Sequence, residues 1–136
     1  MSLQAQLLYS VPSLGIDESQ GPPTLVFVSH QLPLDRFPYS FPSDGGIVIS
    51  NGWLGEPGFY AQRIELFNPQ GGVMVDSGAR TFELTNAHTP YLAVTLLLGL
   101  TFPEPGQHTV VVSLNGRAVL SYPMHILKVP PLGAET

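Results

Sequence analysis

The fold of this chain is decided above all by residues 109–122, which read TVVVSLNGRAVLSY. Asn115-Gly116 is the dipeptide that best suits the positive backbone angles of a two-residue turn. Apolar residues alternate with other residues on both sides of it. The stretch therefore predicts a β-hairpin that joins a strand at 107–114 to a strand at 117–122.

A second hairpin is predicted around Pro69-Gln70-Gly71-Gly72. The strand before it, 59–68, has strict two-residue alternation, which is typical of a strand with one face in the core. The strand after it, 73–84, contains Ser77-Gly78, which predicts a bulge or a second turn.

The remaining strands are predicted from apolar runs between turn residues. We expect one strand at 24–32 and another at 47–50, the latter ended by a tight turn at Asn51-Gly52. The proline-rich segment 33–46 should cross from one sheet to the other. The most apolar run, 91–102, is expected to be a central strand.

Fourteen Gly and fourteen Pro are spread along the 136 residues as punctuation, and they leave little room for helix. The sequence therefore predicts an all-β fold, an antiparallel β-sandwich of the immunoglobulin-like or jelly-roll-like kind with about eight strands. A barrel is the alternative. We expect a single domain over 1–136, with 130–136 as a loose tail.

Charge is scarce: only 11% of the residues are charged, against roughly 25% in an average soluble domain. A surface so neutral favours association with protein, including a second copy of the chain. The net charge of −5 and the lack of any basic run disfavour nucleic acid. No apolar run is long enough for a membrane span. The absence of cysteine slightly favours a reducing, cytoplasmic location.

Several short motifs of this chain resemble those of a known group of proteins. Gly58-Phe59-Tyr60 precedes a strand that ends near Pro69-Gln70-Gly71, and Pro105-Gly106-Gln107-His108 leads into the closing hairpin. In this the chain resembles uncharacterised small bacterial β-sandwich proteins of immunoglobulin-like type. The resemblance implies the fold and assigns no activity.

The residues that could bind a metal ion or take part in catalysis do not form a recognisable site. His30, His88, His108 and His125 lie too far apart in sequence for a short metal-ligand motif, so we predict neither metal nor cofactor. No nucleophile elbow is present, and Ser29-His30 should point to opposite faces of a strand. A pair of carboxylates, Glu65 and Glu83, could approach across the second hairpin, but a solvated face of mixed charge is the stronger interpretation.

An aromatic group in and near the proline-rich crossover is the most unusual feature, and Tyr39, Phe41 and Trp53 are its candidate site residues. One interpretation is that these rings plug an open end of the sandwich. The other is that they form an exposed platform for a ligand or partner. On these grounds the first hypothesis for function is a non-catalytic sandwich that acts through protein association. The alternatives are a small-ligand or saccharide-binding module and, third, an enzyme whose site is assembled from loops.

Overall fold

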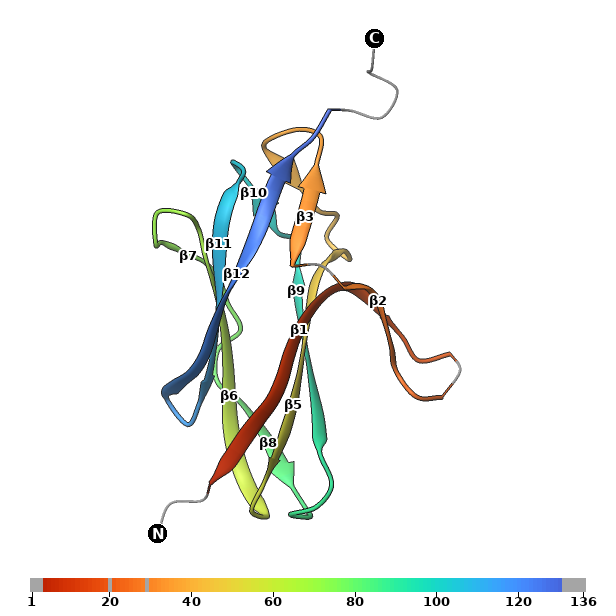
Figure 1. Ribbon diagram of the computed structural model, residues 1–136, viewed down its shortest axis with the longest axis vertical. Coiled ribbons are helices and arrows are strands. Elements are labelled where there is room, and N and C mark those ends of the chain that lie inside the picture. Colours follow the sequence, from red (N-terminus) through yellow and green to blue (C-terminus); the bar gives the residue numbers. More distant parts are fainter. Residues whose placement is uncertain (1–3, 20, 29, 131–136) are drawn as a thin grey trace.

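A computed structural model describes residues 4–19, 21–28 and 30–130 as two packed sheets (Figure 1). The described residues contain twelve strands: β1 (Ala5–Asp17), β2 (Thr24–Val28), β3 (Gln31–Leu34), β4 (Tyr39–Ser40), β5 (Gly46–Gly55), β6 (Gly58–Phe67), β7 (Val73–Asp76), β8 (Arg80–Leu84), β9 (Tyr91–Leu98), β10 (Thr101–Phe102), β11 (Gly106–Leu114) and β12 (Arg117–Lys128). The predicted all-β sandwich is confirmed. The estimate of about eight strands is wrong, because several runs expected to be single strands are divided.

The four-stranded sheet has the order β2-β1-β5-β9, and the larger sheet has the order β3-β12-β11-β6-β7, with β8 also pairing with β6. A two-stranded ribbon of β10 and β4 lies at one end. All pairs are antiparallel except β12 with β3. Both large sheets end in edge strands and do not close into a barrel. No helix in the described part of the chain has the length and apolarity to cross a membrane.

The two predicted hairpins are confirmed. β11 and β12 pair around Asn115-Gly116, where Asn115 has a φ of 52° and Gly116 a φ of 82°. β7 and β8 both pair with β6, and they are separated where Ser77-Gly78 had predicted an interruption. The segment 33–46 does cross between sheets, because β3 belongs to the six-stranded sheet and β5 to the other.

Two sequence predictions of strand limits are wrong. The expected strand at 24–32 is two strands, and β2 and β3 belong to different sheets. Asn51-Gly52 is not a turn but lies inside β5, where both residues are fully buried or nearly so. Contacts with distant strands override the local turn preference. The ring of Tyr9 lies so close over Gly52 that any side chain there would collide with the ring. The Asn51 amide donates a hydrogen bond to Gln62 in the opposite sheet.

The predicted central strand is also corrected. β9 pairs only with β5 and forms the edge of the four-stranded sheet. The run 91–102 is broken at Gly99, which has a φ of 66°, and the chain then turns into β10. Residues 131–136 of the predicted tail, and Ser29, lie outside the described residues.

The core between the sheets is almost entirely apolar, with fully buried Ile49, Ile64, Leu66, Val110 and Val112 at its centre. These residues come from alternate positions of β5, β6 and β11, as the two-residue period of a strand requires. The alternation predicted for 59–68 is therefore confirmed.

One buried polar group interrupts this core and connects the two sheets. Gln62 in β6 accepts hydrogen bonds at Oε1 from Trp53 Nε1 (2.6 Å) and Asn51 Nδ2 (3.0 Å), both in β5. Its Nε2 donates to Thr95 Oγ1 in β9 at 3.2 Å. A single amide thus bonds to three side chains of the facing sheet.

We predict that Gln62→Leu lowers the free energy of unfolding by roughly 2–4 kcal/mol, because it leaves buried donors without an acceptor. Urea unfolding followed by the fluorescence of Trp53, the only tryptophan in the chain, measures this. Gln107→Leu, at an exposed position of β11, is the matched control and should change stability by less than about 0.5 kcal/mol. Equal stability of the two variants would contradict the role given to Gln62.

Candidate functional site

The three aromatic residues predicted as a possible surface do not come together. Trp53 has no exposed surface and stacks on Phe82, with ring centroids 5.7 Å apart. Phe82 also stacks on Tyr60 and on Tyr91, so these four rings form one cluster at the β8 end of the sandwich. An exposed platform that includes Trp53 is therefore wrong.

Tyr39 and Phe41 belong to a second aromatic cluster at the other end, around β4 and β10. Both are half-buried, and their rings meet edge to face at 5.2 Å. Phe41 contacts Phe102, which in turn meets the imidazole of His108 edge to face at 5.2 Å. The aromatic residues thus close both ends of the sandwich, and the crossover supplies only one of the two clusters.

We predict that Trp53→Ala costs about 3–5 kcal/mol of stability, as expected for a large buried aromatic side chain. The half-buried Tyr39→Ala should cost less than half as much. Far-UV circular dichroism during urea unfolding compares the two, since the first variant has no tryptophan. A Trp53→Ala protein as stable as the parent would restore the platform interpretation.

The other candidate groups are kept apart by the sheet. His108 faces the core beside Met124, whereas the neighbouring strand position His125 lies on the opposite face. Glu83 lies opposite Phe59 and Glu65 opposite Asp76, so the two glutamates are not across from each other. Among the described residues, no group of three His, Asp or Glu side chains is placed to hold a metal ion.

An ion pair occupies the outer side of the six-stranded sheet instead. Arg63 binds the carboxylate of Asp76 through two nitrogens, and its guanidinium also lies 3.7 Å from Glu65. The bond from Arg63, with a backbone bond from Gly78, lowers the pKa of Asp76 to about 2. This exposed arrangement is the solvated, mixed-charge face that the sequence favoured over a carboxylate pair.

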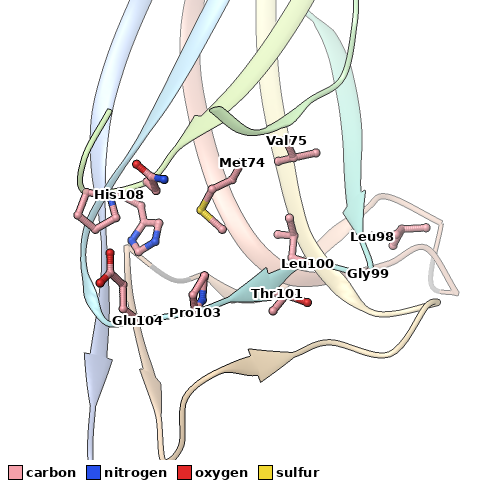
Figure 2. A pocket seen from close by; sticks show the side chains of 11 residues that line it. Met74, Val75, Leu98, Gly99, Leu100, Thr101, Pro103, Glu104 and His108 are labelled. Atoms are coloured by element: carbon pink, nitrogen blue, oxygen red, sulfur yellow. The ribbon is translucent and has the colours of Figure 1, made fainter. Parts of the chain in front are cut away.

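A cleft of about 430 Å³ opens at the β10 end, between β7 and the chain from Leu98 to Pro103 (Figure 2). Its wall combines apolar and polar groups: Met74 and Val75 line it from β7, Leu100 lines it from the facing chain, and Asn68 and Thr101 are also in the lining. Glu104 and His108 supply its ionisable groups, and Figure 2 shows their side chains near each other.

His108 is the most unusual residue of this cleft because it is completely buried. Its Nδ1 lies 3.1 Å from the carbonyl oxygen of Gly106, which places the proton on Nδ1 in the neutral ring. Its Nε2 is buried and has no hydrogen-bond partner among the described residues. Burial lowers the pKa of His108, although the Gly106 carbonyl and the charge of Glu104 act in the opposite direction.

We predict that His108 makes the protein less stable as pH falls. The unfolded chain takes up the proton near pH 6.5 and the folded chain only at lower pH, so stabilisation is complete above 6.5 and is lost below it. Its contribution has a slope of at most about 1.4 kcal/mol per pH unit. Urea unfolding of His108→Phe between pH 7.5 and 5.5 should show a weaker dependence on pH. The exposed His88→Gln should keep the parent slope, and an unchanged slope in His108→Phe would refute the prediction.

A larger feature is the outer face of the four-stranded sheet. It is formed by the side chains that point away from the six-stranded sheet: Tyr9, Val11, Ser13, Val26, Val28, Val48, Ser50, Gly52, Leu92, Val94, Leu96 and Leu98. Leu96 is 53% exposed and Val28 55% exposed. Val48 is buried on this face and is not part of the inner core cluster.

None of these twelve residues is charged. Asp17 extends the same row at the far end of β1, and it lies where the β1–β2 hairpin bends away from the sandwich (Figure 1). This surface was not predicted from the sequence. Its signal was present in the aliphatic residues Leu92, Val94, Leu96 and Leu98 at alternate positions, which were predicted to form part of a central strand at 91–102.

The structure therefore defines an open all-β sandwich with one charged and one uncharged outer sheet face. The chain belongs to a family of unknown function (DUF6941), whose family model matches residues 15–127. That match agrees with the expected uncharacterised family. No curated protein matches the sequence.

Proposed function

We propose that this protein is a non-catalytic β-sandwich that acts through association with protein, including self-association. The observation that supports the proposal best is the uncharged outer face of the four-stranded sheet. Isolated apolar side chains are normal on any protein surface, but a continuous apolar sheet face is typical of an interaction surface.

The distribution of charge supports the same proposal. Ion-paired residues are found on the six-stranded sheet, at Arg63, Glu65 and Asp76. The outer rows of β5 and β9 contain only aliphatic residues, Gly and Ser. Two copies that each carry a charge of −5 repel each other least where neither presents a charge.

We predict that the protein forms a dimer or a larger closed oligomer in solution. Light scattering over a concentration series measures the mass directly. Because the proposed surface has no charged group, raising the salt concentration from 0.05 to 1 M should leave the oligomer intact. A monomer at every concentration would contradict self-association, and dissociation by salt would assign the association to charged residues elsewhere.

A small-ligand module is the second candidate, and the cleft beside His108 favours it. Its volume of about 430 Å³ lies in the range of small-molecule sites, and its lining offers both apolar side chains and hydrogen-bonding groups. A thermal-shift screen with mono- and disaccharides tests the saccharide version. A shift that disappears in Met74→Asp would support a ligand in this cleft, and no shift with any sugar would count against a saccharide.

A further inference from the structure

The free edge of β9 is the most specific interaction surface in the structure. We infer that two copies of this chain pair through β9, antiparallel about a two-fold axis, so that their four-stranded sheets join into one. This inference rests on the proposed function and names the partner and the strand.

The hydrogen bonds of β5 show which backbone groups of β9 are free. Gly99 N donates to the Gly45 carbonyl oxygen at 2.9 Å, in line with the register that pairs Gly46 with Leu98. In an antiparallel pair, residues that exchange hydrogen bonds alternate with residues whose N–H and C=O groups point the other way. The odd-numbered residues of β9 therefore bond to β5, and the even-numbered residues present their backbone groups to the free edge.

The same even-numbered residues carry the exposed apolar side chains. Val94 is 38% exposed, Leu96 53% and Leu98 49%. At this edge, free donors and acceptors thus coincide with aliphatic side chains on the outer face. Another extended backbone with the same alternation satisfies both requirements, and β9 of a second copy has that alternation.

The other edges in the described residues are short, interrupted or protected. Where β2 does not cover it, β1 has a free edge at residues 5–12, which is interrupted by the bulge between Leu7 and Tyr9 and by Pro12. β3 is four residues long and contains Pro33. β2 has five residues, and Phe27 interrupts its extended backbone with a φ of 56°. The part of β12 that β3 does not cover contains Arg117 and Pro123.

The remaining edge strands of the larger sheet are protected by charge. β7 ends in Asp76, and the five-residue β8 contains Arg80 and Glu83. β9 has eight residues with neither charge nor proline. Charged residues, proline and short length are the usual means by which proteins prevent pairing at an edge, and β9 has none of them.

The two-fold axis also fixes the register. Residues that present free backbone groups must face each other, so even-numbered residues pair with even-numbered ones. The register centred on Thr95 pairs all four even-numbered residues of β9. Val94 then lies opposite Leu96 of the second copy, and Leu92 lies opposite its Leu98. Their side chains then form apolar cross-strand pairs on the outer face.

An edge-blocking variant tests the strand. Leu96→Lys places a charge at the centre of the proposed junction and should weaken dimerisation at least ten-fold, measured as the dimer Kd by analytical ultracentrifugation. Val119→Lys is the matched control, since Val119 is 43% exposed on an edge of the other sheet, and it should retain the parent Kd. Circular dichroism establishes that both variants are folded.

Disulfide cross-linking tests the register, and the chain has no cysteine of its own to interfere. Val94→Cys and Leu96→Cys chains are unfolded, mixed, refolded together and oxidised. Opposed residues of an antiparallel pair have Cα atoms about 5.5 Å apart, within the range of a disulfide. We expect covalent dimers from the mixture and few from either variant alone.

The outcomes separate this inference from the proposed function. A dimer that is unaffected by Leu96→Lys would overturn the pairing of β9 while leaving protein association in place. Cross-linking of Val94→Cys or Leu96→Cys with itself would overturn the register centred on Thr95. A monomeric parent protein would overturn the pairing of β9 together with the self-association on which it rests.

Discussion

The hydrogen bonds of Gln62 are the constraint on which the arrangement of the two sheets depends. Apolar packing holds the sheets together but allows them to slide, because aliphatic side chains have no directional preference. The Gln62 amide bonds to Asn51, Trp53 and Thr95, so it connects β6 to β5 and β9 at one relative position. A shift of one residue in any of these strands would turn these side chains away from one another.

The outer sides of the two sheets differ in the residues that they expose to solvent. On the six-stranded sheet, Arg63, Glu65 and Asp76 form ion pairs on the outer side, where Phe59 and Leu127 are also exposed. On the four-stranded sheet, Tyr9 lies over Gly52 and aliphatic residues cover the rest. The asymmetry therefore lies in the charge: both outer sides expose apolar residues, but only that of the six-stranded sheet combines them with ion pairs.

Sequence reasoning was reliable where structure is local. The hairpin at Asn115-Gly116 and the alternation of β6 follow from residues adjacent in the chain, and both are confirmed. It failed at Asn51-Gly52, a turn dipeptide in isolation, because contacts with Tyr9 and Gln62 come from distant strands. It also placed Trp53 with Tyr39, although β5 carries Trp53 to the opposite end of the sandwich.

The position of β9 shows the same limit for the candidate site. When only the composition of an aliphatic strand is known, that composition predicts a central position in the sheet, since apolar residues on both faces are typical of buried strands. Whether its second edge is paired depends on the order of strands, which no local pattern contains. The apolar character of β9 was therefore visible in the sequence, whereas its place at the edge was not.

The parallel pair of β3 and β12 has a consequence for the order of folding during synthesis. His125 pairs with Gln31, so β3 has no strand to join until residues 125–128 have been made. The four-stranded sheet, in contrast, has all its strands once Leu98 has been added. A nascent chain can therefore complete the aliphatic sheet while only β6, β7 and β8 of the facing layer exist, and the part of its inner face that β11 and β12 will cover is then open to water and to chaperones.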